Sequence, residues 1–288
     1  MGVRVITRVE VQSFDGYVYD MSTTSGTFSA SAVERRMPIL LKNTDSVYVR
    51  WKGARMEDAF RLSAEAAEFA SKTFPAPILL EFEKVMCPLA LYTKKRYSFQ
   101  MWENPESPCK ALQHVGTQVI RRDTCLFVRS MLSHILELMI KSNDVDAALK
   151  HSRLEIERLL SREVSMQELV LSRQYKDTYK NPNIPHVRLA ERLRKRKDVN
   201  QVRPGDRVSF VMIEHADGIE TPAYTKESGI AIDVMMYFDK QLKTPLDMIW
   251  GLVMEPEKVY GDLLERCRRK SQKEKALNGY LRLFHRAA

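Results

Sequence analysis

Three short motifs in the first half of the chain decide its fold class. The sequence reads Leu-Glu-Phe-Glu-Lys (80–84), then Lys-Lys-Arg-Tyr (94–97), then Gly116 and Arg-Arg-Asp (121–123). The first motif alternates acidic and apolar residues, as on a strand with one face in the core. Strands are therefore expected at residues 78–85 and 89–99, which places this region in a sheet.

An Asn-Thr-Asp-Ser turn lies upstream, at residues 43–46. The stretches 37–41 and 46–51 around it are apolar and β-branched, so residues 42–45 are predicted to join two strands of a hairpin. Asp45 at its tip suits a metal ligand, because flanking strands fix its direction. A structural Asx turn is the alternative, since such turns are common in loops.

Helices are expected to pack on this sheet. Apolar residues recur at helical spacing over residues 56–74, before Pro75, and the members of that stripe are Ala59, Leu62, Ala66, Phe69 and Ala70. Residues 123–140 predict a strongly apolar helix, with Asp123 as its cap, and Val145–Leu160 predicts an amphipathic one. More helix is expected at residues 222–253.

The composition changes after residue 161. Residues 173–207 hold 11 Lys or Arg and 4 Asp or Glu, an excess of +7, which marks a second, more basic domain. The whole chain of 288 residues carries a net charge of +9, which suits a polyanionic partner. Its four cysteines are scattered, so neither a disulfide framework nor a zinc site is expected. No apolar run approaches a membrane span, and we expect a soluble, intracellular protein without a membrane partner.

The ordered motifs resemble the palm and thumb of family B DNA polymerases, most closely the delta-like enzymes of eukaryotes and large DNA viruses. The resemblance runs from about residue 40 to residue 253. It implies an α+β fold with an antiparallel palm sheet and packed helices, followed by a mostly helical thumb. The expected domains are a divergent segment at 1–38, the palm at 39–165 and the thumb at 166–288. Either residues 1–38 are divergent, or the chain begins inside a longer gene, which we favour.

The resemblance also implies part of a two-metal site for nucleotidyl transfer. In the family, carboxylates hold two Mg²⁺ ions that activate the attacking oxygen and steady the leaving pyrophosphate. Asp45 matches the shared metal ligand, Asn43 stands where the family has a second aspartate, and Glu83 matches a strand carboxylate near the metals. For Glu83, a solvated strand edge with Lys84 as counter-ion is the alternative.

The basic motifs correspond to family contacts with the primer duplex. Lys95 matches the residue that senses the minor groove, where acceptors common to all base pairs test pairing geometry. Tyr97 is expected beside the primer terminus, with Lys94 and Arg96 nearer the phosphates. An ordinary basic strand is the alternative for this motif.

The remaining expected phosphate contacts come from the Arg-Arg-Asp segment and from a basic helix that begins near His186. Structural bracing is the alternative for one of the arginines of the Arg-Arg-Asp segment. For the basic helix the alternatives are a solvated charged face or a nuclear-localisation cluster. His186 itself is expected to cap or pack. The candidate residues are Arg121, Arg122, Arg188, Arg192, Arg194, Lys195 and Arg196.

The resemblance implies a DNA-directed DNA polymerase fragment that binds primer–template duplex, without base-sequence preference. Deoxynucleoside triphosphates, a processivity factor and the absent N-terminal part are expected partners of the intact enzyme, in the nucleus or at a viral replication site. Since other catalytic motifs are absent, little or no polymerase activity is expected from this chain alone. A non-catalytic duplex-binding module, or one half of a split polymerase, is the alternative, and Lys42, Asn43 and Val115 favour it.

Overall fold

The structure, a computed structural model, describes residues 18–22, 27–30, 39–42, 47–75, 79–93, 95–176, 178–181, 183–196 and 202–287. Side chains are described within these ranges from residue 47 to residue 273. The chain divides into two compact units. The first comprises Met1–Ala90 and Ser98–Gln113, and the second comprises Leu91–Tyr97 and His114–Ala288.

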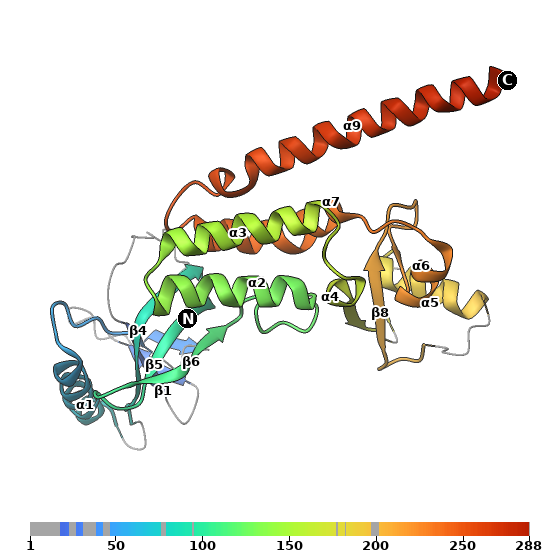
Figure 1. The fold of residues 1–288 in the computed structure, drawn as a ribbon. Helices are drawn as coiled ribbons and strands as arrows, with labels where there is room; N and C mark the ends of the chain where they lie inside the picture. The colour runs from blue at the N-terminus through green and yellow to red at the C-terminus, as the bar shows by residue number, and fades with distance from the viewer. Residues whose placement is uncertain are drawn as a thin grey trace. The chain divides into compact units, whose positions relative to one another are not determined.

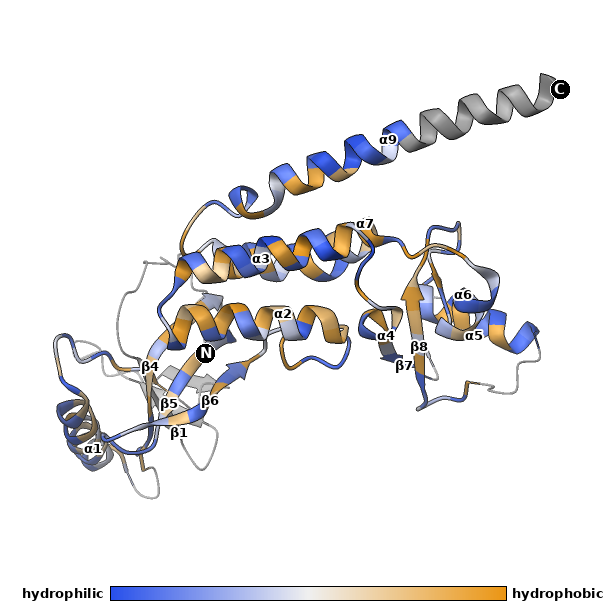
Figure 2. Ribbon diagram, in the orientation of Figure 1, coloured by the Kyte–Doolittle hydropathy of each residue, from blue (hydrophilic) through white to orange (hydrophobic). Residues whose placement is uncertain are grey.

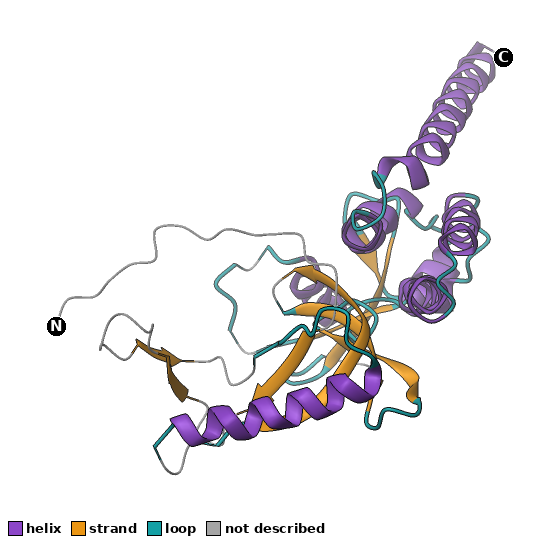
Figure 3. Ribbon diagram, turned by 90° about the vertical axis from the view of Figure 1, so that its left-hand side faces the viewer, coloured by secondary structure: helices purple, strands orange, loops and turns teal. Residues whose placement is uncertain are grey.

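A four-stranded sheet in the order β1-β4-β5-β6 forms the centre of the first unit. Its strands are β1 (Val18–Ser22), β4 (Glu81–Thr93), β5 (Arg96–Trp102) and β6 (Pro108–Val115). The first of them, β1, runs antiparallel to β4. The long helix α1 (Met56–Thr73) lies against these strands (Figure 3). Ala59 of α1 and Val85 of β4 are buried together in a small core, and the Phe60 and Phe82 rings meet edge to face at 5.4 Å.

The expected hairpin at residues 37–51 is wrong in its second strand. β3 (Ile39–Lys42) pairs instead with the upstream strand β2 (Thr27–Ala30), and residues 47–51 form no strand. Trp51 packs on the α1 core and donates from Nε1 to Ser63 Oγ at 3.0 Å. These apolar residues are therefore held by packing under the helix, which requires no strand pairing.

The strand boundaries in the Leu-Glu-Phe-Glu-Lys region also differ from those expected. A break at residues 86–88 was predicted, whereas β4 continues through Cys87 and the cis-linked Pro88 to Thr93. The real break is the turn around Lys95, where β5 begins. Exposed and half-buried residues alternate along Glu81–Lys84, as the pattern predicted.

Helices form the core of one part of the second unit. They are α2 (Leu126–Leu136), the π-helical segment η1 (Glu137–Lys141), α3 (Val145–Leu160), α7 (Val234–Tyr237), the π-helical segment η2 (Phe238–Leu242), α8 (Lys243–Trp250) and α9 (Glu257–Ala287). Figure 1 shows α2 and α3 running side by side, and Figure 2 shows how apolar α2 is. Arg153 of α3 holds the start of α9 through a two-pronged pair with Asp262, at 2.9 and 2.6 Å. No helix of the described residues is both long and apolar enough to span a bilayer.

A three-stranded sheet, in the order β7-β8-β9, lies in the other part of the second unit. Its strands are β7 (Leu171–Gln174), β8 (Arg207–Met212) and β9 (Ile219–Glu220), and the helices of this part are α4 (Met166–Leu169), α5 (Pro185–Lys195) and α6 (Pro222–Ser228). β8 is antiparallel to both neighbours. The sequence predicted a mostly helical region at residues 166–288, and this sheet was not expected there. The α+β fold class itself is confirmed.

Asp123 does not cap α2, contrary to expectation. The helix begins at Leu126 after Cys125, and no side chain caps its first turn. The Asp123 carboxylate binds the Arg121 guanidinium instead, with Nε–Oδ1 and Nη2–Oδ2 distances of 2.9 and 2.7 Å. A charged, two-pronged partner competes better for a carboxylate than a single backbone N–H.

Candidate nucleic-acid interface

Three of the predicted site residues lie outside the described residues. They are Asn43 and Asp45 of the expected metal site and Lys94 of the basic motif. The outcome for these residues therefore stays a prediction.

Glu83 lies on β4 with an exposed side chain. Its Oε1 is 2.6 Å from Lys84 Nζ, so the counter-ion of the alternative interpretation is present. Among the described residues, no three His, Cys, Asp or Glu side chains gather as a metal site. Glu83 is thus one carboxylate, already paired with Lys84, and it does not form a two-metal site by itself.

Lys95 is held in a tight turn between β4 and β5. Its own backbone has a φ of +63°, and its carbonyl oxygen lies against Gly116, whose φ is +62°. A Cβ on Gly116 would stand 2.1 Å from that oxygen. A glycine is therefore required here, and the predicted Gly116 motif supports the turn that presents the Lys95 side chain to solvent.

The other two described residues of the basic motif are half-buried. Arg96 Nη1 lies 3.5 Å from Met248 Sδ of α8, so this guanidinium contacts protein rather than standing free. Tyr97, the next residue, is also half-buried. Of the motif's described cations, Lys95 is the exposed one.

Arg121 and Arg122 stand at the edge of a groove in the second unit, in the segment before α2. The Arg121 guanidinium lowers the pKa of Asp123, chiefly through their hydrogen bonds. That carboxylate is therefore charged at neutral pH, and its charge is already balanced by Arg121. Arg122 is exposed, and its side chain points to no acidic partner among the described residues.

The groove has a volume of about 640 Å³ and a strongly basic lining. Its cationic side chains are Arg121, Arg122, Arg173, Lys176, Lys180 and Arg207. Among the lining residues that the structure describes, one is acidic, Asp123. Apart from the Arg121–Asp123 pair, none of these cations has a carboxylate within 4.0 Å in the part of the chain that the structure describes. The groove is therefore a concentration of uncompensated positive charge.

An aromatic cluster fixes the segment that carries Lys176 and Lys180. The Tyr179 hydroxyl accepts from the Lys176 backbone N–H at 2.8 Å and lies 3.3 Å from Nε2 of the buried His186. Burial, with a smaller contribution from Arg173, lowers the pKa of His186. His186 is thus a neutral packing residue in the groove, as its sequence context predicted.

Two arginine side chains of the same unit make contacts within the protein. Arg207 of β8 donates to the Ser172 carbonyl at 2.6 Å and to its hydroxyl at 2.8 Å. Arg194 of α5 lies 5.1 Å from the Tyr175 ring centroid. Both therefore have structural contacts, although both side chains remain exposed.

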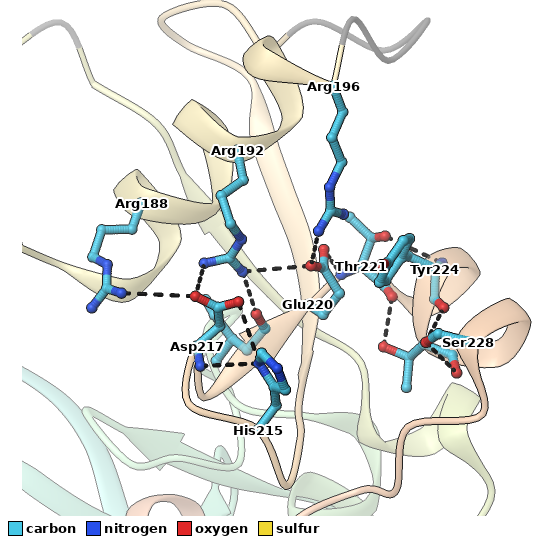
Figure 4. A network of polar contacts seen from close by, with 11 residues as sticks. Arg188, Arg192, Arg196, His215, Asp217, Glu220, Thr221, Tyr224 and Ser228 are labelled. Carbon is cyan, nitrogen blue, oxygen red and sulfur yellow. Dashed lines mark hydrogen bonds and ion pairs between the residues drawn. The ribbon is translucent and has the colours of Figure 1, made fainter.

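The predicted phosphate-binding face of α5 is largely occupied by protein. Arg188, Arg192 and Arg196 recur every four residues and face two carboxylates, Asp217 and Glu220 (Figure 4). Those acids come from the end of β9 and the loop before it, and neither was predicted. Lys195 is exposed, with no ion pair among the described residues. Part of this row is therefore held by ion pairs within the protein, which was not among the alternatives expected for this helix.

The sequence pointed to the basic block but not to its individual groove residues. Arg173, Lys176, Lys180 and Arg207 all fall within the range 173–207 that was singled out by charge. A charge count does not show which of the eleven cations line one groove. That depends on the pairing of β7 with β8, two strands that α5 separates in the sequence.

Comparisons with known proteins identify the family of the chain. The sequence model of DNA polymerase family B matches residues 8–252, and so begins well before residue 40, where the resemblance was expected to start. The chain is similar to DNA polymerase delta catalytic subunits of eukaryotes. It is 32% identical to that of Plasmodium falciparum over 78% of this chain and 21% of the relative. For Oryza sativa the values are 35%, 83% and 22%, and for Schizosaccharomyces pombe 36%, 75% and 20%. The chain thus spans about a fifth of the length of these relatives.

Proposed function

The chain belongs to family B of the DNA polymerases, and we propose that it acts as the duplex-binding part of such an enzyme. The observation that carries this proposal is the basic groove, defined by Arg121, Arg122, Arg173, Lys176, Lys180 and Arg207. Phosphates of a nucleic-acid backbone are the ligands that such a groove suits, because lysine and arginine neutralise them without reading sequence.

The geometry favours a polyanion over a small acidic ligand. The groove is broad and open, with exposed cations on the segment before α2, on β7 and its following loop, and on β8. A chain of phosphates satisfies several separated cations at once, whereas a single small anion satisfies one or two. Each phosphate contact also releases counter-ions, so binding must weaken steeply as salt rises.

Salt-dependent binding of a labelled primer–template duplex, followed by fluorescence anisotropy, tests the proposal. Lys180→Gln and Arg122→Gln should each weaken binding and reduce the slope of log K against log salt by about 0.9 per lost phosphate contact. Lys240→Gln is the matched control, because Lys240 is an exposed cation of the same unit on η2, outside the groove. If the control loses as much affinity as the groove variants, net charge explains the binding and the groove does not.

Lys95 is the second proposed DNA contact, at the minor groove of the newly paired duplex. Its exposed side chain and the tight turn under it support this role. A sensor of pairing geometry should discriminate paired from mismatched primer ends. Lys95→Met should therefore reduce the affinity ratio between matched and mismatched duplexes, while Lys240→Met should leave that ratio unchanged.

For the whole enzyme we propose primer extension from deoxynucleoside triphosphates with two Mg²⁺ ions. Asp45, Asn43 and Glu83 are the residues of this chain that would lie near those ions, and the ions would supply positive charge to the transferred phosphoryl group. A nuclear location, a processivity factor and a viral origin stay predictions, as do palm and thumb boundaries at 39–165 and 166–288.

The second candidate function is a duplex-binding module without catalysis of its own. The substitution of Asn43 for an aspartate favours it, because a neutral amide is a weaker metal ligand than a carboxylate. Primer extension with Mg²⁺, using the chain and its Asp45→Asn variant, separates the two. Extension that the substitution abolishes would establish catalysis, whereas duplex binding without extension would support the module.

A further inference from the structure

The arginine row of α5 has one more positive charge than its acidic partners have negative ones. Arg188, Arg192 and Arg196 face Asp217 and Glu220, as Figure 4 shows. Three guanidinium groups therefore share two carboxylates. The distances and burial show which guanidinium group is least satisfied.

Glu220 belongs to the folded framework. Its side chain is 2% exposed, and its oxygens accept from Arg196 Nη2 at 3.0 Å and from the Thr221 backbone N–H at 2.9 Å. Arg196 is further held over the Tyr224 ring, 4.1 Å from the centroid. A buried carboxylate with this many donors is costly to disturb, so the Arg196–Glu220 pair belongs to the folded framework.

Asp217 is more exposed than Glu220, with 30% of its side chain accessible. One of its oxygens is 3.2 Å from Arg192 Nη1 but 3.8 Å from Arg188 Nη2. The Arg192 side chain is 20% exposed and also donates to the Ile219 carbonyl at 2.6 Å, whereas that of Arg188 is 50% exposed. Arg188 is thus the guanidinium group with the longest and most solvated ion pair.

We propose that Asp217 is a positioning residue that holds Arg188 in the free protein and competes for it with a backbone phosphate of bound nucleic acid. The inference rests on the proposed function, since it assigns a role within duplex binding. An exposed pair at this distance is weak, so a phosphate that accepts two hydrogen bonds from the guanidinium can displace it. Arg192 stays on Asp217 and Glu220 and keeps α5 in place.

The contact between Arg188 and Asp217 should lower the affinity of the protein for a duplex. Part of the favourable energy of the Arg188–phosphate contact is offset by breaking the contact with Asp217. Removing the Asp217 charge should therefore strengthen duplex binding. The gain must depend on Arg188, because the competition is for that side chain.

A double-mutant cycle on duplex affinity tests the inference, with wild type, Asp217→Asn, Arg188→Gln and the double variant compared by anisotropy. Asp217→Asn should tighten binding by about two- to fivefold, the range that an exposed ion pair allows. In the Arg188→Gln background the same change should have no more effect than the control. Glu191→Gln is that control, because it removes one exposed negative charge from α5 outside the paired row.

The outcomes separate this inference from the proposed function. Equal effects of Asp217→Asn and Glu191→Gln, or a gain that persists without Arg188, would overturn the competition while leaving duplex binding intact. Absence of salt-sensitive duplex binding in all variants would overturn both. Circular dichroism and thermal unfolding of each variant identify any loss of fold, and Asp217→Ser provides a second removal of the charge if Asp217→Asn does not fold.

Discussion

Replacing Gly116 with alanine should loosen the turn that presents Lys95. Two physical terms add at this position. A left-handed backbone costs an L-residue about 1–2 kcal/mol, and the φ of Gly116 is +62°. The new Cβ would also stand 2.1 Å from the Lys95 carbonyl oxygen, and a backbone atom cannot rotate away as a side chain does. We expect a total loss of about 3 kcal/mol or more, in the range of strongly destabilising substitutions.

Gly229→Ala is the matched control, because its φ of +66° is nearly the same and no atom lies within 4 Å of the added Cβ. It should lose only the backbone term, about 1–2 kcal/mol. Hydrogen exchange of the core amides in α2 and α3 measures the free energy of unfolding of the second unit for both variants. Equal losses for the two variants would refute the close approach of Gly116 to the Lys95 turn.

Three further outcomes are expected. The hydrogen bonds from Arg121 lower the pKa of Asp123. The contribution of this carboxylate to stability is therefore present above the unfolded pKa of about 4 and is lost as the pH falls through the lower folded value. In urea unfolding, the difference in free energy of unfolding between wild type and Asp123→Asn should shrink as the pH falls below about 4. Tyr237→Phe should cost about 1–3 kcal/mol in thermal unfolding, because the buried hydroxyl donates to the Leu169 carbonyl at 2.6 Å. Burial raises the pKa of Cys125 to about 11, so this thiol should resist a thiol reagent at neutral pH until urea unfolds the chain.

Helix positions could be predicted from the sequence, but the buried face of α1 could be predicted only in part. The range Val145–Leu160 coincides with α3, and the expected helix at 56–74 matches α1 within one residue. The apolar stripe expected to face the core of α1 nevertheless leaves Phe69 73% exposed. Of the buried residues of α1, Ala59 belongs to that stripe, whereas Ser63 and Ala67 do not. Ser63 can be buried because it accepts from Trp51 and donates to the Ala59 carbonyl, two partners that a hydrophobic pattern does not reveal.

The candidate site was predictable in the same partial way. A charge count located the basic block, and the short motifs identified Lys95, Arg121 and Arg122 as candidates. The sequence did not show that α5 turns arginines toward Asp217 and Glu220, since those acids come from a separate segment, more than twenty residues later. Spacing within a helix predicts which residues share a face, but not what that face meets.

The two groups of cations in the second unit therefore have different physical roles. Around Glu220, positive charge is matched by a buried carboxylate and ring contacts, and removing a partner there leaves an uncompensated charge in the fold. Around the groove, exposed cations such as Lys176, Lys180 and Arg207 have no carboxylate within ion-pair distance among the described residues. Backbone phosphates of a bound duplex would neutralise these charges, as the proposed function requires. The groove is therefore the part of the second unit whose charge the proposed duplex binding would account for, whereas most of the α5 row is accounted for by ion pairs within the fold.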